Sequence, residues 1–300
     1  MTQNRTLVSG ANGFVGSALV NEWERQERPV SRLLRSPGAG NIPFSLWNPS
    51  AGQIDPGCFA GVGQVVHLAG DNISEGRWTR AKKDRILQSR IQGTQLLCAT
   101  LARLSSPPQV LVSASAVGFY GDRGSEVLTE DSVAGAGFLS EVCQAWEAQT
   151  EPARQAGIRC VHLRLGVVLS PSGGALAKML PPFRLGVGGR IGSGQQYMSW
   201  ITLPDLLAAI DHCLADTRLS GPVNAVSPGA VTNLEFTRAL GRSLGRPTLL
   251  PLPSLMARLI FGEMAEATLL ASTRVAPTKL SATGFHFSAP SIADALAGLR

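Results

Sequence analysis

Short apolar runs alternate along the first half of the chain with longer segments whose apolar positions recur every three or four residues. The runs have the length and composition of buried strands, and they fall at residues 7–9, 30–34, 65–68, 110–113 and 160–165. The longer segments predict helices at residues 15–25, 82–104 and 138–156. This alternation predicts an α/β fold, a Rossmann-type doubly wound parallel sheet, whose ligands bind at the carboxyl ends of the strands.

The pattern changes after residue 170. Glycine and proline become frequent up to residue 194, and further elements are predicted at residues 175–180, 205–214, 222–226 and 254–270. We therefore expect a nucleotide-binding domain at residues 1–169. Residues 170–300 are expected to form a smaller substrate-side region that returns in part to the sheet, with a separate C-terminal domain from about residue 247.

Three glycines directly after the first predicted strand, Gly10, Gly13 and Gly16, have the spacing G-x-x-G-x-x-G. The first allows a tight strand-to-helix turn, the second lets the backbone approach a pyrophosphate, and the third lets the helix pack closely on the strand. The N-terminus of the following helix offers N–H groups and a positive dipole end to phosphates. In this position the motif predicts a dinucleotide site, although a glycine-rich turn without a ligand is the alternative.

The end of the second predicted strand indicates which dinucleotide is bound. An acidic residue there holds the ribose 2′-hydroxyl of NAD, whereas an arginine accommodates the 2′-phosphate of NADP. Arg35 and Ser36 follow this strand, and no Asp or Glu occurs from residue 29 through 54. Arg35 can pair with the extra phosphate and Ser36 can add a hydrogen bond. The sequence therefore predicts NADP(H), unless these arginines are only solvated charges.

Charge and composition narrow the remaining partners. The net charge is +6, but the basic residues are scattered and have few aromatic neighbours, which argues against a nucleic-acid partner. No apolar run could span a bilayer, so no membrane partner is expected. The five cysteines are widely separated, and the four histidines lack metal-ligand spacing, so no metal is expected. We expect a cytoplasmic monomer or homodimer.

Several sequence strings resemble the extended short-chain dehydrogenase/reductases, which are NAD(P)-dependent epimerases and dehydratases. They include the glycine turn, His67-Leu68-Ala69-Gly70 and the segment from Ser113 to Gly121. Strings around Trp146 and Arg164 and in the tail at residues 272–277 are most similar to an atypical branch called "epimerase family protein". This branch has its own C-terminal domain. The resemblance covers nearly the whole chain.

The resemblance implies roles for individual residues. Those that would line the pyrophosphate are Gly10, Gly13, Phe14, Val15 and Gly16. Arg35 and Ser36 would contact the adenosine phosphate. The cofactor would be bordered by Leu68, Ala69 and Gly70. Ser115 matches the serine that orients the substrate carbonyl or hydroxyl.

The chain departs from the family at its usual catalytic pair. Ordinary members carry Y-x-x-x-K on a helix, where the lysine lowers the phenol pKa and the tyrosine acts as acid or base. This chain contains only two tyrosines, and neither is followed four residues later by lysine. The helix expected to carry the pair has Phe138 and Val142 at these positions. The usual proton relay is therefore absent.

Two interpretations of this departure remain open. In the first, the protein is an oxidoreductase or nucleotide-sugar epimerase with a displaced acid, for which Tyr120 assisted by Ser115 is the candidate. A packed loop aromatic is the alternative for Tyr120. In the second, the protein binds NADP(H) without turning it over, as a sensor or interaction module with a link to cell division.

The predicted substrate side contains cations in a glycine- and proline-rich segment. Lys178, Arg184 and Arg190 would suit an anionic small-molecule substrate, such as a diphosphate. Ordinary solvated loop charges are an equally good interpretation.

Overall fold

An eight-stranded sheet forms the centre of the computed structural model, which describes residues 5–38 and 40–299. The strand order is β12-β8-β6-β5-β1-β2-β3-β4, and the pairs from β12 to β3 are parallel. The strands span β1 (Arg5–Ser9), β2 (Val30–Leu34), β3 (Phe44–Asn48), β4 (Gln53–Ile54), β5 (Val62–His67), β6 (Val110–Ala116), β8 (Arg159–Leu165) and β12 (Gly221–Ala225). The order reverses at β1, which is the switch point where doubly wound sheets bind ligands.

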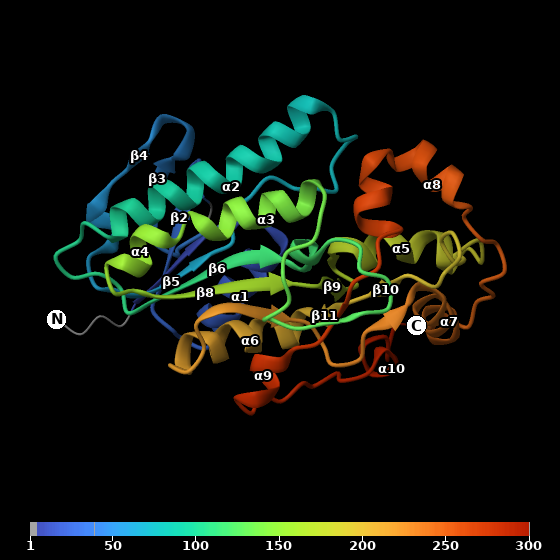
Figure 1. Cartoon of the computed structure of the whole chain (residues 1–300). Coiled ribbons are helices and arrows are strands. Elements are labelled where there is room, and N and C mark those ends of the chain that lie inside the picture. Colours follow the sequence, from blue (N-terminus) through green and yellow to red (C-terminus); the bar gives the residue numbers. More distant parts are fainter. Residues whose placement is uncertain (1–4, 39, 300) are drawn as a thin grey trace.

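Helices cover both faces of this sheet (Figure 1). On one face lie α1 (Phe14–Arg25) and α6 (Leu203–Ala215). On the other lie α2 (Arg80–Leu101), α3 (Phe138–Ala148) and α4 (Glu151–Gln155). Each layer has its own apolar core, one around Trp23 and Ile210, the other around Trp47 and Leu97. The predicted fold class is confirmed.

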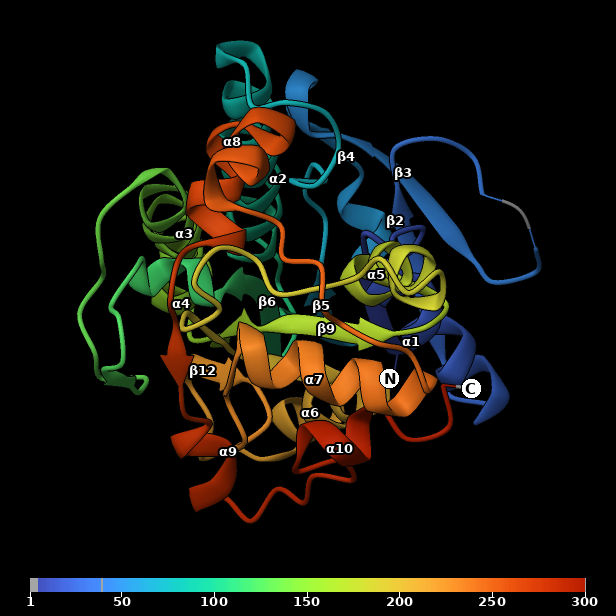
Figure 2. The same ribbon diagram turned by 90° about the vertical axis from the view of Figure 1, so that its right-hand side faces the viewer.

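The remaining elements gather at the carboxyl end of the sheet and along one face (Figures 1 and 2). They comprise β7 (Val127–Leu128), β9 (Val167–Ser170), α5 (Gly174–Arg184), β10 (Tyr197–Met198), β11 (Trp200–Thr202), β13 (Val231–Thr232), α7 (Asn233–Leu244), α8 (Ser254–Phe261), β14 (Arg274–Val275), α9 (Thr278–Ala282) and α10 (Ile292–Ala295). β14 pairs with β7, which ties the C-terminal segment to the loop after β6. No helix within residues 5–38 and 40–299 is long and apolar enough to cross a membrane.

Two predicted helices are shorter in the structure. The helix predicted over residues 138–156 breaks between α3 and α4, where Pro152 lies in the first turn of α4. Proline lacks an N–H and clashes with the carbonyl four residues before it, so it starts a helix better than it continues one. The helix predicted over residues 254–270 is interrupted at Gly262, which adopts a φ of 63°, and a π-helical segment follows at Ala265–Leu269.

Candidate functional site

The turn between β1 and α1 leaves no room for side chains. Gly10 has a φ of 72°, and a Cβ placed there would lie 2.6 Å from the carbonyl carbon of Leu68. A Cβ at Gly16 would lie 2.3 Å from the carbonyl oxygen of Gly10. Contacts this short are prohibitive, so both positions require glycine. The result is a bare backbone turn that ends in the first turn of α1.

Arg35 and Ser36 directly follow β2 and are both exposed. The parallel register pairs Ser9 with Leu33, so the end of β2 lies beside the start of the glycine turn. Arg35 therefore follows the strand end that lies next to the glycine turn. The roles of Arg35 and Ser36 in binding stay predictions.

The end of β5 forms the other wall of the turn. His67 is fully buried, with its Nδ1 2.5 Å from the Ser9 hydroxyl oxygen and its Nε2 2.9 Å from that of Thr94. These contacts link β1, β5 and α2. They hold the following residues, Leu68 and Ala69, against Gly10.

His67 makes stability sensitive to acid. Burial lowers its pKa from 6.5 to about 4, so below pH 6.5 the unfolded chain binds a proton that the folded chain does not. The free energy of unfolding should therefore fall by about 3 kcal/mol between pH 6.5 and pH 4 from this group. Urea unfolding across this range, compared between the wild type and His67→Gln, tests this. A variant with the same pH dependence as the wild type would contradict it.

A partly buried arginine on α2 lies against the loop that follows β5. Arg90, on α2, donates from Nη1 to the carbonyl oxygens of Asp71 (3.1 Å) and Ile86 (3.0 Å). Its guanidinium lies 4.8 Å from the ring centroid of Trp146, and a Cβ on Gly70 would come within 3.2 Å of its Cζ. The positive charge is thus held against the backbone of Gly70. Sequence analysis did not assign this residue a role.

The helix that would carry the tyrosine–lysine pair presents apolar groups. Phe138 packs edge-on against Trp78 with their ring centroids 5.3 Å apart, and Val142 is buried in the same cluster. Neither side chain can donate a proton. In the structure, too, these two positions hold packed apolar side chains in place of a phenol and an ammonium.

The residues of α3 that face the end of β6 are Leu139 and Cys143, each one position after Phe138 and Val142. Cys143 approaches the carbonyl oxygen of Ala116 at 3.6 Å, and four residues earlier Leu139 lies against Gly118. Burial raises the pKa of Cys143 to about 11, so it is a neutral thiol. Val142 instead packs with Trp78 and Ile86, on the side of α3 that faces α2. In either register the pair is missing.

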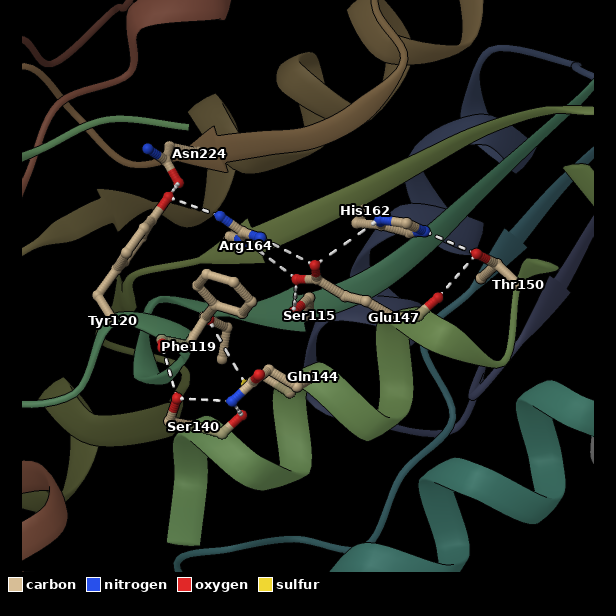
Figure 3. Close-up of polar contacts among 12 residues, drawn as sticks. Ser115, Phe119, Tyr120, Ser140, Gln144, Glu147, Thr150, His162, Arg164 and Asn224 are labelled. Atoms are coloured by element: carbon tan, nitrogen blue, oxygen red, sulfur yellow. Dashed lines mark hydrogen bonds and ion pairs between the residues drawn. The ribbon is translucent and has the colours of Figure 1, made fainter. Parts of the chain in front are cut away.

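Three polar residues stand in one row across neighbouring strands. The register pairs Ser115 on β6 with Arg164 on β8, and Arg164 with Asn224 on β12. Glu147 on α3 completes the group, since Ser115 Oγ donates to its Oε1 at 2.6 Å. Arg164 donates to both carboxylate oxygens of Glu147, each at 2.9 Å (Figure 3). This buried, bidentate ion pair fixes the Ser115 hydroxyl.

Tyr120 belongs to the same network and is fully buried. Its hydroxyl donates to Asn224 Oδ1 at 2.7 Å and accepts from Arg164 Nη1 at 3.0 Å (Figure 3). Burial raises its pKa, which keeps the phenol protonated. The structure thus gives Tyr120 the packed position that was the alternative interpretation. Its hydroxyl is already engaged, and this argues against Tyr120 as the displaced acid.

Glu147, Arg164 and Asn224 were not assigned roles from the sequence, although a signal was present. Arg164 lies within a strand predicted to be buried, and a buried charge requires a partner. The sequence could not name that partner, because Glu147 lies 17 residues away on a helix whose rotation was unknown.

The cations of the substrate-side segment do not act together. Lys178 Nζ donates to Ser74 Oγ at 2.8 Å, which connects α5 with the loop after β5. Arg184 and Arg190 are exposed further along the chain. Binding of an anionic substrate by these residues stays a prediction.

Comparison with known proteins identifies the family. Residues 6–226 match the "NAD dependent epimerase/dehydratase family". The chain belongs to this family. Residues 252–299 match a domain of unknown function, DUF1731, which agrees with the epimerase-like branch suggested by the sequence strings. "Epimerase family protein Mb2239" of Mycobacterium bovis is 44% identical over 289 residues, which cover 96% of this chain and 95% of that protein.

Solved structures of family members have the same fold. Human epimerase family protein SDR39U1 (isoform2), solved with NADPH, has a TM-score of 0.88 and 35% identity, and the match covers 97% of each chain. A nucleoside-diphosphate sugar epimerase from Corynebacterium glutamicum has a TM-score of 0.80 and 33% identity, over 98% of this chain and 57% of the other. These matches cover nearly the whole of the present chain, including its C-terminal region.

Proposed function

We propose that this protein binds NADP(H) at the carboxyl ends of β1, β2 and β5. The observation that carries the proposal is the bare glycine turn, where a Cβ would collide with backbone, placed beside the exposed Arg35. The human relative solved with NADPH supports the same choice of cofactor. The site residues of the glycine turn fit a pyrophosphate, since α1 begins there with N–H groups that have no acceptor within the helix.

Individual residues take the following places in this proposal. The backbone groups of Gly10, Gly13, Phe14, Val15 and Gly16 bind the pyrophosphate. Arg35 and Ser36 bind the 2′-phosphate. The backbone of Leu68, Ala69 and Gly70 borders the cofactor, and Arg90 supplies a positive charge behind Gly70.

The proposed site holds the cofactor without the family's usual proton donor. A bound nicotinamide would supply or accept a hydride, and the chain would then need to move a proton at the substrate oxygen. Phe138 and Val142 cannot do this, and the Tyr120 hydroxyl is committed to Asn224 and Arg164. These observations favour cofactor binding with little or no turnover.

A second candidate function is an oxidoreductase that uses Ser115. Ser115 lies at the carboxyl end of β6 and donates to Glu147 at 2.6 Å. In alcohol oxidation, Ser115 could accept the substrate proton while passing its own to the Glu147 carboxylate. Both carboxylate oxygens of Glu147 already accept hydrogen bonds from Arg164, which limits their part in such a relay.

Turnover assays distinguish the two candidates. The protein is mixed with NADPH or NADP⁺ and a panel of carbonyl compounds, alcohols and nucleotide sugars, and nicotinamide absorbance is followed. Binding of NADPH without turnover of any compound supports the first candidate. Turnover that disappears in Ser115→Ala and persists in Tyr120→Phe supports the second, whereas failure to bind NADPH contradicts both.

Tyr120→Phe also tests the structural role of this hydroxyl. Removing it leaves Asn224 Oδ1 and one Arg164 N–H without their partner in a buried region. The free energy of unfolding should fall by about 1–3 kcal/mol, while NADPH affinity stays unchanged. Urea unfolding and NADPH titration of the same preparation measure the two quantities. A variant as stable as the wild type would contradict this assignment.

A further inference from the structure

Apolar side chains are unusually exposed at one end of the molecule, in the segment after α5, in the segment before α8 and on α8 itself. This end faces the reader in Figure 2. We define the apolar end patch by Leu185, Val187, Leu249, Leu250, Leu255 and Leu259, which are 51% or more exposed. Leu249 is 83% exposed and Leu185 is 78% exposed. Isolated exposed leucines are ordinary, but several on neighbouring segments at one end of the molecule indicate an interaction surface.

Backbone contacts join the segments of this patch. Ile191 and Leu252 form a parallel bridge, and the carbonyl oxygen of Leu250 lies so close to Gly189 that a Cβ there would be 1.9 Å away. Residues 185–191 therefore run beside residues 247–252. Helix α8 begins directly after this second segment and exposes Leu255 and Leu259 one turn apart.

Exposed arginines are interleaved with these apolar residues. Arg184 and Arg190 flank Leu185 and Val187, while Arg242 and Arg246 precede Leu249. Within the part of the chain that the structure describes, none of these four guanidinium groups forms an ion pair.

The acidic residues just after α8, Glu263 and Glu266, do not cancel this charge. Glu263 pairs with Lys83 at 2.7 Å, and Glu266 pairs with Arg258. The end of the molecule therefore presents apolar side chains among uncompensated positive charges.

We propose that the apolar end patch docks this protein on an anionic lipid surface. Leucines inserted at the boundary between headgroups and acyl chains gain free energy in proportion to the apolar area they bury, and arginines around them contact lipid phosphates. A leaflet can adapt to an irregular, projecting patch such as this one. Association with a membrane surface needs no membrane-spanning helix. The sequence alone led us to expect no membrane partner, and this proposal departs from that expectation.

A second copy of the chain fits this surface less well. In a two-fold symmetric contact, the same patch meets itself, so the arginines around Leu185 and Leu249 would face one another. Like charges brought together oppose such an interface. An anionic surface instead supplies the complementary charge.

Vesicle flotation tests the proposal. The full chain is mixed with vesicles of phosphatidylcholine alone or of phosphatidylcholine with phosphatidylglycerol. We expect binding to the anionic vesicles that weakens with salt. Replacing Arg242 and Arg246 by glutamine together should reduce the affinity roughly 30-fold, because each arginine near such a surface contributes about fivefold. Replacing Leu249 and Leu250 by serine should reduce it by at least about tenfold.

Matched control variants distinguish binding through the apolar end patch from non-specific binding to vesicles. Val133→Ser removes a side chain that is 72% exposed elsewhere, and Arg103→Gln removes an exposed charge at the far end of α2. Both should bind vesicles as the wild type does. Equal binding to neutral and anionic vesicles, no binding, or equal losses in the controls would overturn the proposal. A dimer in sedimentation that Leu249→Ser abolishes would overturn it in favour of a second copy.

Discussion

Replacing Arg35 by aspartate should weaken NADPH binding by about a hundredfold or more and change NADH binding little. In the proposed site the guanidinium makes charge-assisted hydrogen bonds to the 2′-phosphate, and each such bond contributes about 1.5–3 kcal/mol. Aspartate removes this attraction and adds repulsion. Since NADH lacks the phosphate and its ribose hydroxyl can donate to a carboxylate, NADH should lose nothing comparable. Titrations of both cofactors measure the two changes.

Two further variants sharpen the test of Arg35. Arg35→Ala removes the attraction without the repulsion and should give an intermediate loss of NADPH affinity. Arg103→Asp makes the same charge change on an exposed residue far from the glycine turn and should leave both affinities unchanged. Equal losses of NADPH and NADH in Arg35→Asp would show that the residue supports the fold and not the phosphate.

Glu147→Ala should lower the free energy of unfolding by about 3–5 kcal/mol. The substitution leaves the Arg164 guanidinium, whose side chain is 4% exposed, without its bidentate partner, and it frees the Ser115 hydroxyl. Breaking a buried ion pair by removing one partner costs this much because the remaining charge stays desolvated. Arg164 also donates to Tyr120, so the effect should reach the loop after β6. Urea unfolding monitored by tryptophan fluorescence measures the loss.

Two further variants test whether the loss comes from the buried charge pair of Glu147. Glu147→Gln keeps an oxygen for Ser115 and should destabilise less than Glu147→Ala. Glu151→Ala breaks an ion pair with Arg154 on the surface, where solvent screens the charges, and stability should hardly change. A Glu147→Ala protein as stable as the Glu151→Ala protein would contradict the structural role of the network.

Much of the sheet could be predicted from local pattern. Strand β2 has the predicted bounds, and all five of its residues are buried, as expected for a parallel strand covered on both faces. Helix α7 was missed although Thr232 and Glu235 form a capping box, a signal present in the sequence as T-x-x-E. Strand β3 was missed, because its alternate residues are exposed and it lacks the pattern of a strand buried on both faces.

The candidate site also has a part that the sequence predicts locally and a part that depends on the tertiary structure. The glycine turn and Arg35 are local features, so their position next to one another follows once the strand order is known. The network of Ser115, Glu147 and Arg164 depends on strand register and on the rotation of α3, which no local pattern records. The burial of Tyr120 has the same origin, since its hydroxyl donates a hydrogen bond to Asn224, which lies 104 residues further along the chain.

The central claim is that the chain has an NADP(H) site although it lacks the usual proton relay. Calorimetric titration of the wild-type protein with NADPH and, in parallel, with NADH tests it most directly. We expect NADPH to bind at least about tenfold more tightly than NADH, because Arg35 contributes about 1.4 kcal/mol or more through the 2′-phosphate. NADH binding as tightly as NADPH, or no heat of binding with either, would contradict it.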